Sequence, residues 1–249
     1  MKHSTFMSYS KSQQRGFTIV EIMLAITLSM ILIAGVIQVY LSSKESFRVQ
    51  NELARLQENQ RIAIEFLQRD ISQAGFIRPP GKLINLPGVF ITVNDGGGTT
   101  SDSITVTYES TTDCLGALTP NGFAVNTYFI TPATPQQPVP QLVCTGNGGG
   151  TQPIADGVEN MQILIGDDAL TTNSSLPGSA DRYVNPTVPV PTTQIASIRI
   201  ALLISTQNPV RATPVAQNII LLDTNVVRND RVRRQVITTT IPLPNARNV

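Results

Sequence analysis

Charged and aromatic side chains are scarce in this chain. Of its 249 residues, 14% are charged and 5% are aromatic, and the formal net charge is +1. A chain without an overall basic field has no whole-molecule attraction for nucleic acid. Glycine and proline are plentiful by comparison, with 17 residues of each. This composition favours a loop-rich β domain outside the cytoplasm over a cytoplasmic enzyme.

The sequence after the N-terminal apolar run also lacks motifs for catalysis. The glycine-rich segments 94–98 and 146–150 lack the Lys-Ser/Thr pair of a phosphate-binding loop, so we interpret them as flexible turns. Two adjacent carboxylates, Asp167 and Asp168, are interpreted as solvated turn residues rather than as an acid–base pair. The sequence therefore predicts no active site.

One long apolar run stands near the N-terminus, from Phe17 to Leu41, and Glu21 is its only charged residue. About 20 apolar residues in a helix are enough to cross a bilayer. The preceding residues include Lys2, Lys11 and Arg15 and no acid, which favours a cytoplasmic location for that end. A lone carboxylate in such a span is costly and calls for a functional reason.

The order of residues at the start of this run is unusual. An ordinary secretory signal has a small-residue cleavage site after its apolar region, whereas here Gly16 comes before it. An uncleaved signal anchor is the alternative; it explains the charge and the hydrophobicity but not the Gly-Phe-Thr-x-x-Glu order.

The segment Gly16-Phe17-Thr18-Ile19-Val20-Glu21 resembles the cleavage and methylation motif of type IV pilins and of type II secretion pseudopilins. The resemblance implies that a prepilin peptidase cuts after Gly16 and methylates the new N-terminus at Phe17. It also implies that Glu21 guides docking into a growing fibre.

Removal of such a leader would take away His3, the only histidine of the chain. The mature protein could then form neither a Ser-His-Asp system nor a histidine-ligated zinc site. We expect no cofactor, no metal and no enzymatic activity.

Both cysteines, Cys114 and Cys144, lie in the half that the apolar run would place outside the cytoplasm. A disulfide is the expected state in an oxidising compartment, and two reduced thiols are the alternative. The chain-entropy model gives such a bridge about 3–4 kcal/mol of stabilisation.

Helical periodicity continues beyond the apolar run. Apolar residues follow steps of three and four, with Gln60 interrupting the stripe, and predict one helix from Phe17 to Ala74, apolar all round at first and amphipathic later. They are Val49, Leu53, Leu56, Ala63, Leu67, Ile71 and Ala74. The charged residues between them are expected on the exposed face, where Glu65 could pair with Arg69 and Arg48 with Glu52. Gly75 and then Pro79-Pro80 end the helix. A heptad coiled coil is the alternative.

From Arg78 onward the pattern has a period of two, which is typical of half-buried strands. The predicted strands are Phe90–Val93, Ser103–Tyr108, Phe123–Ile130, Val158–Ile165, Ile195–Ile204, Ile219–Leu222 and Gln235–Ile241. No helical segment separates them, so an antiparallel sheet is favoured. The predicted fold is α+β, a long N-terminal helix packed on a C-terminal antiparallel sheet. The predicted parts are a leader (1–16), a transmembrane half-helix (17–41), an amphipathic half-helix (42–75) and a β-rich domain (76–249).

Three segments of the β-rich part resemble PilW-type minor pilins: Val158–Gln162, Ile198–Leu202 and Arg233–Asn245. The resemblance implies an inner-membrane protein with its C-terminal domain in the periplasm, later part of a pilus at the cell surface. Its implied partners are the prepilin peptidase, other minor pilins, the major pilin and the inner membrane. Many major pilins have a helix-melting proline at the position of Gln38, so its absence favours a minor pilin.

Other roles stay open at this stage. A pseudopilin of a type II secretion system would have the same parts, and a pilus-tip adhesin or DNA-binding subunit is a third interpretation. The cluster of Arg228, Arg231, Arg233 and Arg234 could contact nucleic acid, although we favour a solvated turn. The segment 166–184 has scattered oxygen side chains that could bind calcium but lacks a bidentate glutamate at a fixed spacing.

Overall fold

A computed structural model describes residues 16–78, 89–169 and 179–245 of the chain. It contains two compact units, residues 1–48 and residues 49–249. The leader predicted for residues 1–16 lies outside the described residues except for Gly16.

The first unit consists of the N-terminal part of helix α1, which extends over Ile19–Ile71. It is the one helix among the described residues that is long and apolar enough to cross a membrane. Every described residue of this unit from Gly16 to Phe47 is exposed. The composition and length predicted for a membrane span are therefore present.

Helix α1 ends close to the predicted stop. Turns follow Ile71, and Gly75 adopts a φ of 76°, a left-handed conformation that favours glycine at the end of a helix. The Gly75 N–H donates to the carbonyl oxygen of Thr107 at 3.0 Å. The helix is thus terminated by the sheet as well as by the glycine.

The second unit contains a five-stranded antiparallel sheet in the order β1-β2-β3-β4-β5. Its strands are β1 (Ile91–Asn94), β2 (Ser103–Glu109), β3 (Phe123–Thr131), β4 (Gln141–Gly146) and β5 (Thr151–Asp156). Each strand pairs with the next one in sequence, so the sheet is a meander.

A four-stranded antiparallel sheet has the order β11-β8-β6-β7, and β9 and β10 pair by themselves. These strands are β6 (Val158–Asp167), β7 (Arg182–Val184), β8 (Ile195–Ser205), β9 (Val215–Leu221), β10 (Thr224–Asp230) and β11 (Arg234–Pro242). Two short 3-10 helices precede β3 and β8, at Pro120–Gly122 and Thr192–Gln194. The predicted α+β fold class with antiparallel sheets is confirmed.

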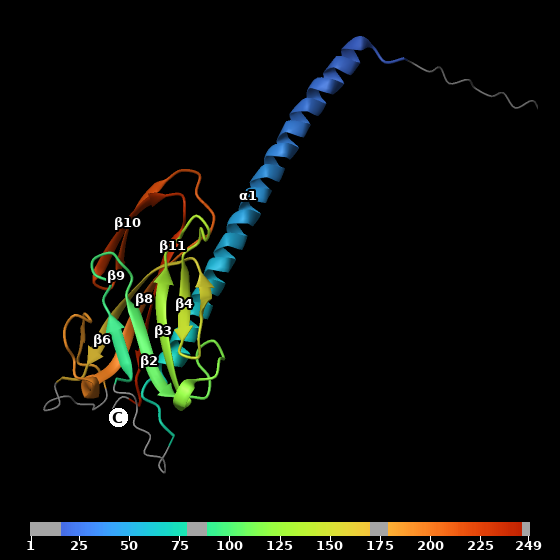
Figure 1. Cartoon of the computed structure of the whole chain (residues 1–249). Helices are drawn as coiled ribbons and strands as arrows, with labels where there is room; N and C mark the ends of the chain where they lie inside the picture. The colour runs from blue at the N-terminus through green and yellow to red at the C-terminus, as the bar shows by residue number, and fades with distance from the viewer. Residues whose placement is uncertain (1–15, 79–88, 170–178, 246–249) are drawn as a thin grey trace, which may run out of the picture. The chain divides into compact units, whose positions relative to one another are not determined.

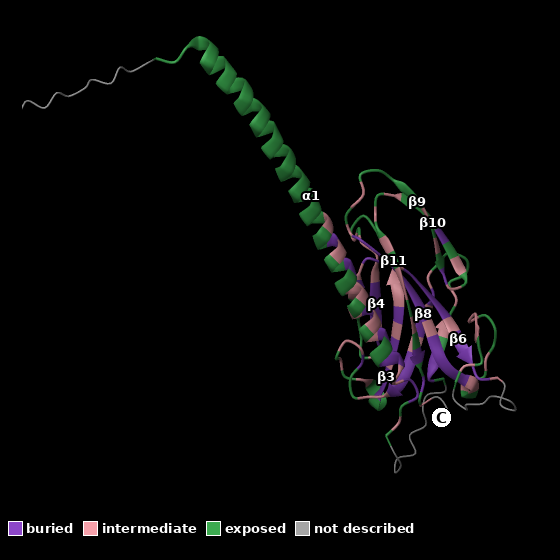
Figure 2. Ribbon diagram, turned by 180° about the vertical axis from the view of Figure 1, so that it is seen from behind, coloured by how far each residue is buried: buried purple, intermediate pink, exposed green. Residues whose placement is uncertain are grey.

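The main core of the second unit lies between the C-terminal part of α1 and both larger sheets. In Figure 1 this part of α1 passes behind β3 and β4, and Figure 2 shows buried residues along the strands. The helix contributes Leu56, Ala63, Leu67 and Ile71 to the core. Val49 and Leu53 of the predicted apolar stripe are only half-buried. The β9–β10 hairpin packs on Ala201 and Leu203 in a smaller cluster.

Two acidic residues of α1 were expected on its charged face but are buried, Glu52 at 6% exposure and Asp70 at 5%. The Glu52 carboxylate accepts hydrogen bonds from the backbone and side-chain nitrogens of Asn208, at 3.2 and 2.7 Å. The helical ion pairs also differ from the predicted ones. Arg61 bridges Glu58 and Glu65, and Arg48 pairs with Glu45.

Candidate assembly site

The helix start is built around Thr18. Its hydroxyl oxygen accepts a hydrogen bond from the Glu21 N–H at 3.2 Å, and its carbonyl oxygen accepts one from the Ile22 N–H at 3.2 Å. Thr18 is therefore the N-cap, and Glu21 is the third helical residue, as in a Thr-x-x-Glu capping box. This role of Thr18 was not predicted, although the Thr-x-x-Glu spacing indicates it.

The predicted processing residues lie directly before the helix. Gly16 and Phe17 are non-helical and exposed, and a Cβ added to Gly16 would meet no atom within 4 Å. Phe17 is 80% exposed. The peptide bond between Gly16 and Phe17 is therefore not covered by other described residues of this chain. Cleavage by a peptidase would need such access.

Glu21 shares one side of the helix with apolar and small side chains. Phe17, Ile22, Ala25, Ile26, Ser29, Met30 and Ile33 line this surface together with it. No ion pair of the Glu21 carboxylate occurs among residues 16–78, 89–169 and 179–245. A carboxylate at the first turn interacts favourably with the positive end of the helix dipole. In an apolar medium it would also favour a cationic partner.

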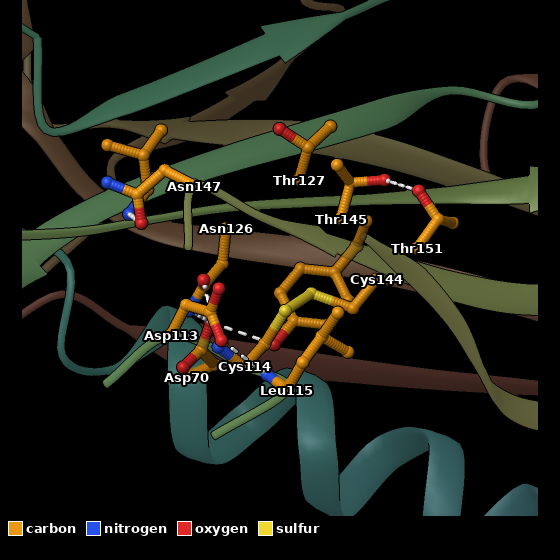
Figure 3. Close-up of a disulfide and its surroundings, with 12 residues drawn as sticks. Asp70, Asp113, Cys114, Leu115, Asn126, Thr127, Cys144, Thr145, Asn147 and Thr151 are labelled. Atoms are coloured by element: carbon orange, nitrogen blue, oxygen red, sulfur yellow. Dashed lines mark hydrogen bonds between the residues drawn. A yellow bond between two sulfur atoms is a disulfide. The ribbon is translucent and has the colours of Figure 1, made fainter. Parts of the chain in front are cut away.

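The predicted bridge between Cys114 and Cys144 is confirmed: the two residues form a disulfide (Figure 3). Cys144 lies in β4, and Cys114 lies in the loop after β2. The neighbouring Asp113 carboxylate accepts from the backbone N–H groups of Leu115, Ala117 and Gly148, at 2.9, 3.0 and 2.9 Å. The loop is thus held to β4 by one covalent bond and to the β4–β5 turn by one buried carboxylate.

A polar cluster joins this loop to the helix. The Cys114 N–H donates to Asn126 Oδ1 at 3.0 Å, and Asn126 Nδ2 donates to Asp70 Oδ2 at 2.9 Å. Asp70 also accepts from the Tyr128 hydroxyl at 2.8 Å and from the Tyr108 hydroxyl. Burial, followed by the charge of Asp70, raises the pKa of both tyrosines. Asp70 therefore fixes the end of α1 to three neighbouring side chains of the sheet.

The spacing of the two buried acids was a usable signal. Glu52 is four residues before Leu56, and Asp70 is three residues after Leu67, so both fall on the apolar stripe. An acid at such a position predicts a buried partner, because an unpaired buried charge is costly.

The arginine cluster does not form a free basic patch. The Arg234 guanidinium donates to both oxygens of Asp230, at 2.8 and 2.7 Å, and to Glu159 at 2.8 Å. These hydrogen bonds hold the pKa of Asp230 below its usual value. Arg228 lies 3.9 Å from the same Glu159. A buried, paired Arg234 cannot contact phosphate, which argues against the nucleic-acid alternative, and at this residue it also differs from the favoured solvated turn.

The segment considered for calcium differs from the expected solvated turn. Asp167 and Asp168 are 1% and 4% exposed, and Asp167 pairs with Arg182 at 2.7 Å. They are buried because β6 continues to Asp167 and pairs with β7. Residues 170–178 of this segment lie outside the described residues. Within the described part of the chain, no group of three metal-binding side chains is found.

Two family models match parts of the chain. The family model described as "Type IV Pilus-assembly protein W" matches residues 127–245, and the model described as "Prokaryotic N-terminal methylation motif" matches residues 11–37. No curated protein matches the chain. One similar solved structure is the type IV-like pilin TTHA1219 from Thermus thermophilus, with 14% identity and a TM-score of 0.47. The match covers 77% of this chain and 97% of that one. The chain is thus similar to type IV pilus-assembly protein W over residues 127–245 and to the N-terminal methylation motif over residues 11–37.

Proposed function

We propose that this protein is a minor pilin that primes or caps a type IV pilus together with other minor pilins. The observation that carries the proposal is the methylation motif at the start of an apolar helix in a chain with a PilW region. A pilin-type assembly subunit acts by packing its helix among other helices, so its function lies in an interface rather than in an active site.

Processing comes first in this proposal. A prepilin peptidase cuts between Gly16 and Phe17 and leaves an amine on Phe17. The apolar helix stays in the inner membrane, and residues 76–249 are in the periplasm. The basic residues before the span support this orientation.

Assembly then depends on the Glu21 carboxylate. Inside a bundle of apolar helices, an unpaired amine and an unpaired carboxylate are both costly, and each is the natural partner of the other. Glu21 of one subunit therefore pairs with the amine of a neighbour. Helix α1 is also unbroken at Gln38, which suits a subunit that need not melt its helix in a long shaft.

Substitution of Glu21 in the native host tests this proposal. Glu21→Gln is the sharpest variant, because glutamine can replace glutamate in a capping box but carries no charge. We expect Glu21→Gln and Glu21→Ala to leave the protein abundant, cleaved and membrane-bound. Both should lose co-purification with other pilins and reduce piliation at least about tenfold. Glu21→Asp, with a shorter reach, should be intermediate.

Two controls separate assembly from folding. Glu65→Gln removes an exposed carboxylate further along the same helix and should assemble as the wild type does. Thr18→Ala removes the capping hydroxyl but keeps the charge of Glu21, so it should have a smaller effect than Glu21→Gln. Wild-type assembly by Glu21→Gln would contradict the proposed pairing.

A pseudopilin of a secretion system is the alternative, and loss of secretion with intact pili in a deletion strain would favour it.

A further inference from the structure

Strand β11 forms an outer edge of the four-stranded sheet. Among the described residues it pairs with β8 alone, and the pairing has no register shift. Two hydrogen bonds at its ends fix the direction of its backbone groups. The Leu243 N–H donates to the carbonyl oxygen of Ala196 at 3.0 Å, and the Thr206 N–H donates to that of Arg233 at 2.9 Å. Odd-numbered residues of β11 therefore bond to β8, and even-numbered residues direct their N–H and C=O groups outward.

The outward backbone groups include those of Val236, Thr238 and Thr240. No described strand lies on that side of β11, and Thr238 and Thr240 are exposed. Pro242, which has no N–H, also falls at an even-numbered position, where it breaks no hydrogen bond to β8. A row of unpaired N–H and C=O groups along a strand edge is a template for pairing with another chain.

The other outer edges of the two larger sheets are protected against such pairing. β1 has four residues and β7 has three. β5 contains Pro153, and its pairing with β4 has a register shift. Short strands, proline and irregular pairing are common ways of preventing edge-to-edge association. β11 has nine residues, and from Val236 to Ile241 all of them are β-branched, which favours an extended strand.

A groove lies beside this edge, between β11 and helix α1 of the second unit. Its volume is about 770 Å³, within the usual range for ligand-binding clefts. Ile64 of α1 and Ile237 of β11 line it, and both are half-buried. Alternate side chains of a strand added to β11 would lie on the α1 face of the sheet and enter the groove. The edge and the groove are thus two separate features that fit one extended peptide.

The charges in the wall of the groove cancel. Arg61 bridges Glu58 at 2.8 Å and Glu65 at 3.1 Å, and Arg69 is stacked over the Phe66 ring at 4.8 Å. Uncharged amide groups are contributed by Gln57, Gln60, Gln68 and Gln235. The groove therefore fits an uncharged stretch of peptide.

The N-terminal end of β11 is positively charged. Arg231 and Arg233 are exposed, and neither forms an ion pair within the described part of the chain. The C-terminal end of an antiparallel strand would lie beside them, where carboxylates are complementary. A second copy of β11 does not fit, because residues 235–245 contain no acid.

We propose that the outer edge of β11, together with the groove, is a docking site for an extended strand of another protein, uncharged along its length and acidic at its C-terminal end. The strand pairs antiparallel with β11 through Val236, Thr238 and Thr240 and continues the sheet. Its acidic end lies beside Arg231 and Arg233. The surface belongs to the second unit, so its test does not depend on the pairing proposed for Glu21.

Peptide binding to the full-length protein in detergent micelles tests the proposal. The probe is the fluorescein-labelled peptide Thr-Val-Gln-Val-Thr-Val-Gln-Thr-Asp-Glu with a free C-terminal carboxylate, and binding is followed by fluorescence anisotropy. We expect saturable binding that weakens as salt is added. Replacement of the terminal Asp-Glu by Lys-Lys should weaken binding by about tenfold or more.

Backbone methylation of the peptide distinguishes strand addition from other binding modes. Every second residue of an added strand bonds to β11, so N-methylation of alternate residues should act differently in its two phases. One phase should weaken binding by about tenfold or more, and the other by less than about threefold. Residue-resolved hydrogen exchange should show new protection of the Val236, Thr238 and Thr240 N–H groups on binding.

Variants of β11 test the same surface from the protein side. Thr238→Pro removes an outward N–H without removing a hydrogen bond to β8 and should weaken binding by about tenfold or more. Thr238→Val keeps the N–H and is the matched control. Arg231→Gln with Arg233→Gln should weaken binding of the acidic peptide about tenfold but not that of the Lys-Lys peptide. Arg55→Gln, which changes an exposed arginine of α1, should bind as the wild type does.

Four results would overturn the proposal: no binding of the acidic peptide, equal losses for the two methylation phases, no new protection of the outward N–H groups, or unchanged binding by Thr238→Pro. If Thr238→Pro fails to fold, the methylated peptides still decide, because they leave the protein unchanged. Self-association of the wild type through β11 would assign the edge to a second copy and would also overturn the proposal.

Discussion

The acidic residues in the two parts of helix α1 differ in burial and in bonding partners. In the second unit, Glu52 and Asp70 are buried, and both receive hydrogen bonds from residues far away in the sequence. In the first unit, Glu21 stands on an exposed apolar helix, and among the described residues its carboxylate has no ion pair.

The two kinds of acid differ in where their bonding partners lie. An acid on an apolar surface is costly unless it is paired. Asp70 is satisfied within its own chain, so its role is to stabilise the fold. Glu21 has no ion pair among the described residues, so we propose that its partner in a membrane comes from another subunit.

The largest effect is expected at Asp70. Asp70→Ala leaves two tyrosine hydroxyls and the Asn126 amide without their acceptor in the core. We expect the free energy of unfolding to fall by about 3–5 kcal/mol, measured by denaturant unfolding of the full chain in detergent. Glu65→Ala, on the exposed side of the helix, should change it by less than about 0.5 kcal/mol. A loss below about 1 kcal/mol for Asp70→Ala would contradict the stabilising role of Asp70.

The disulfide should come next. Cys114 and Cys144 are 30 residues apart, and opening this loop should lower the free energy of unfolding by about 3–4 kcal/mol. The double substitution Cys114→Ser with Cys144→Ser measures the loss, and membrane association should be unchanged because the first unit has no part in it. Peptide mapping without reductant should recover the two cysteine peptides joined. Free thiols at both positions would contradict the bridge.

A smaller, pH-dependent effect is expected at Asp102. Burial is the main cause that raises the pKa of its carboxyl to about 6, although it accepts hydrogen bonds from the Gly96 and Ile163 N–H groups. The folded state then holds a proton that the unfolded state releases above about pH 4. Stability from this group is therefore complete below pH 4 and is lost as the pH rises to about 6, by up to about 3 kcal/mol.

Asp102→Asn removes this dependence. The unfolding free energy of the wild type minus that of Asp102→Asn should fall by up to about 3 kcal/mol as the pH rises from 4 to 7. Asp230 should act in the opposite direction, because its pKa is lowered by Arg234 and its stabilisation is lost only as the pH falls below about 4. A difference that does not change between pH 4 and 7 would show that Asp102 titrates normally.

Periodicity predicted most of the fold because most elements bury one face. The seven predicted strands are all present, and the helix was placed within three residues at each end. Four strands were missed. β4 and β5 flank a glycine-rich turn, and β5 contains Pro153; β7 has only three residues. In β10 only Val226 is buried, so its sequence has little hydrophobic alternation.

The candidate site was predictable to the extent that it depends on local sequence. The methylation motif was found by its resemblance to a known family, and the disulfide was predicted from the expected compartment of the two cysteines. The partners of Glu52 and Asp70 could not be predicted, because Asn208, Tyr108 and Tyr128 reach them only through the tertiary fold. The roles of Gly16, Phe17 and Glu21 remain predictions, since they concern a reaction and contacts with other proteins.

The proposed function is tested most directly by identifying the first residue of the mature protein. Protein extracted from membranes of the native host should be analysed by intact mass and by N-terminal peptide mass spectrometry. The account predicts one species that begins at N-methylated Phe17 and lacks residues 1–16. A prepilin-peptidase deletion strain should accumulate the full-length form. A mature protein that begins at Met1, or after Ala25 or Ala34, would contradict the identification of Gly16-Phe17 as the processing site and of the helix as an assembly element.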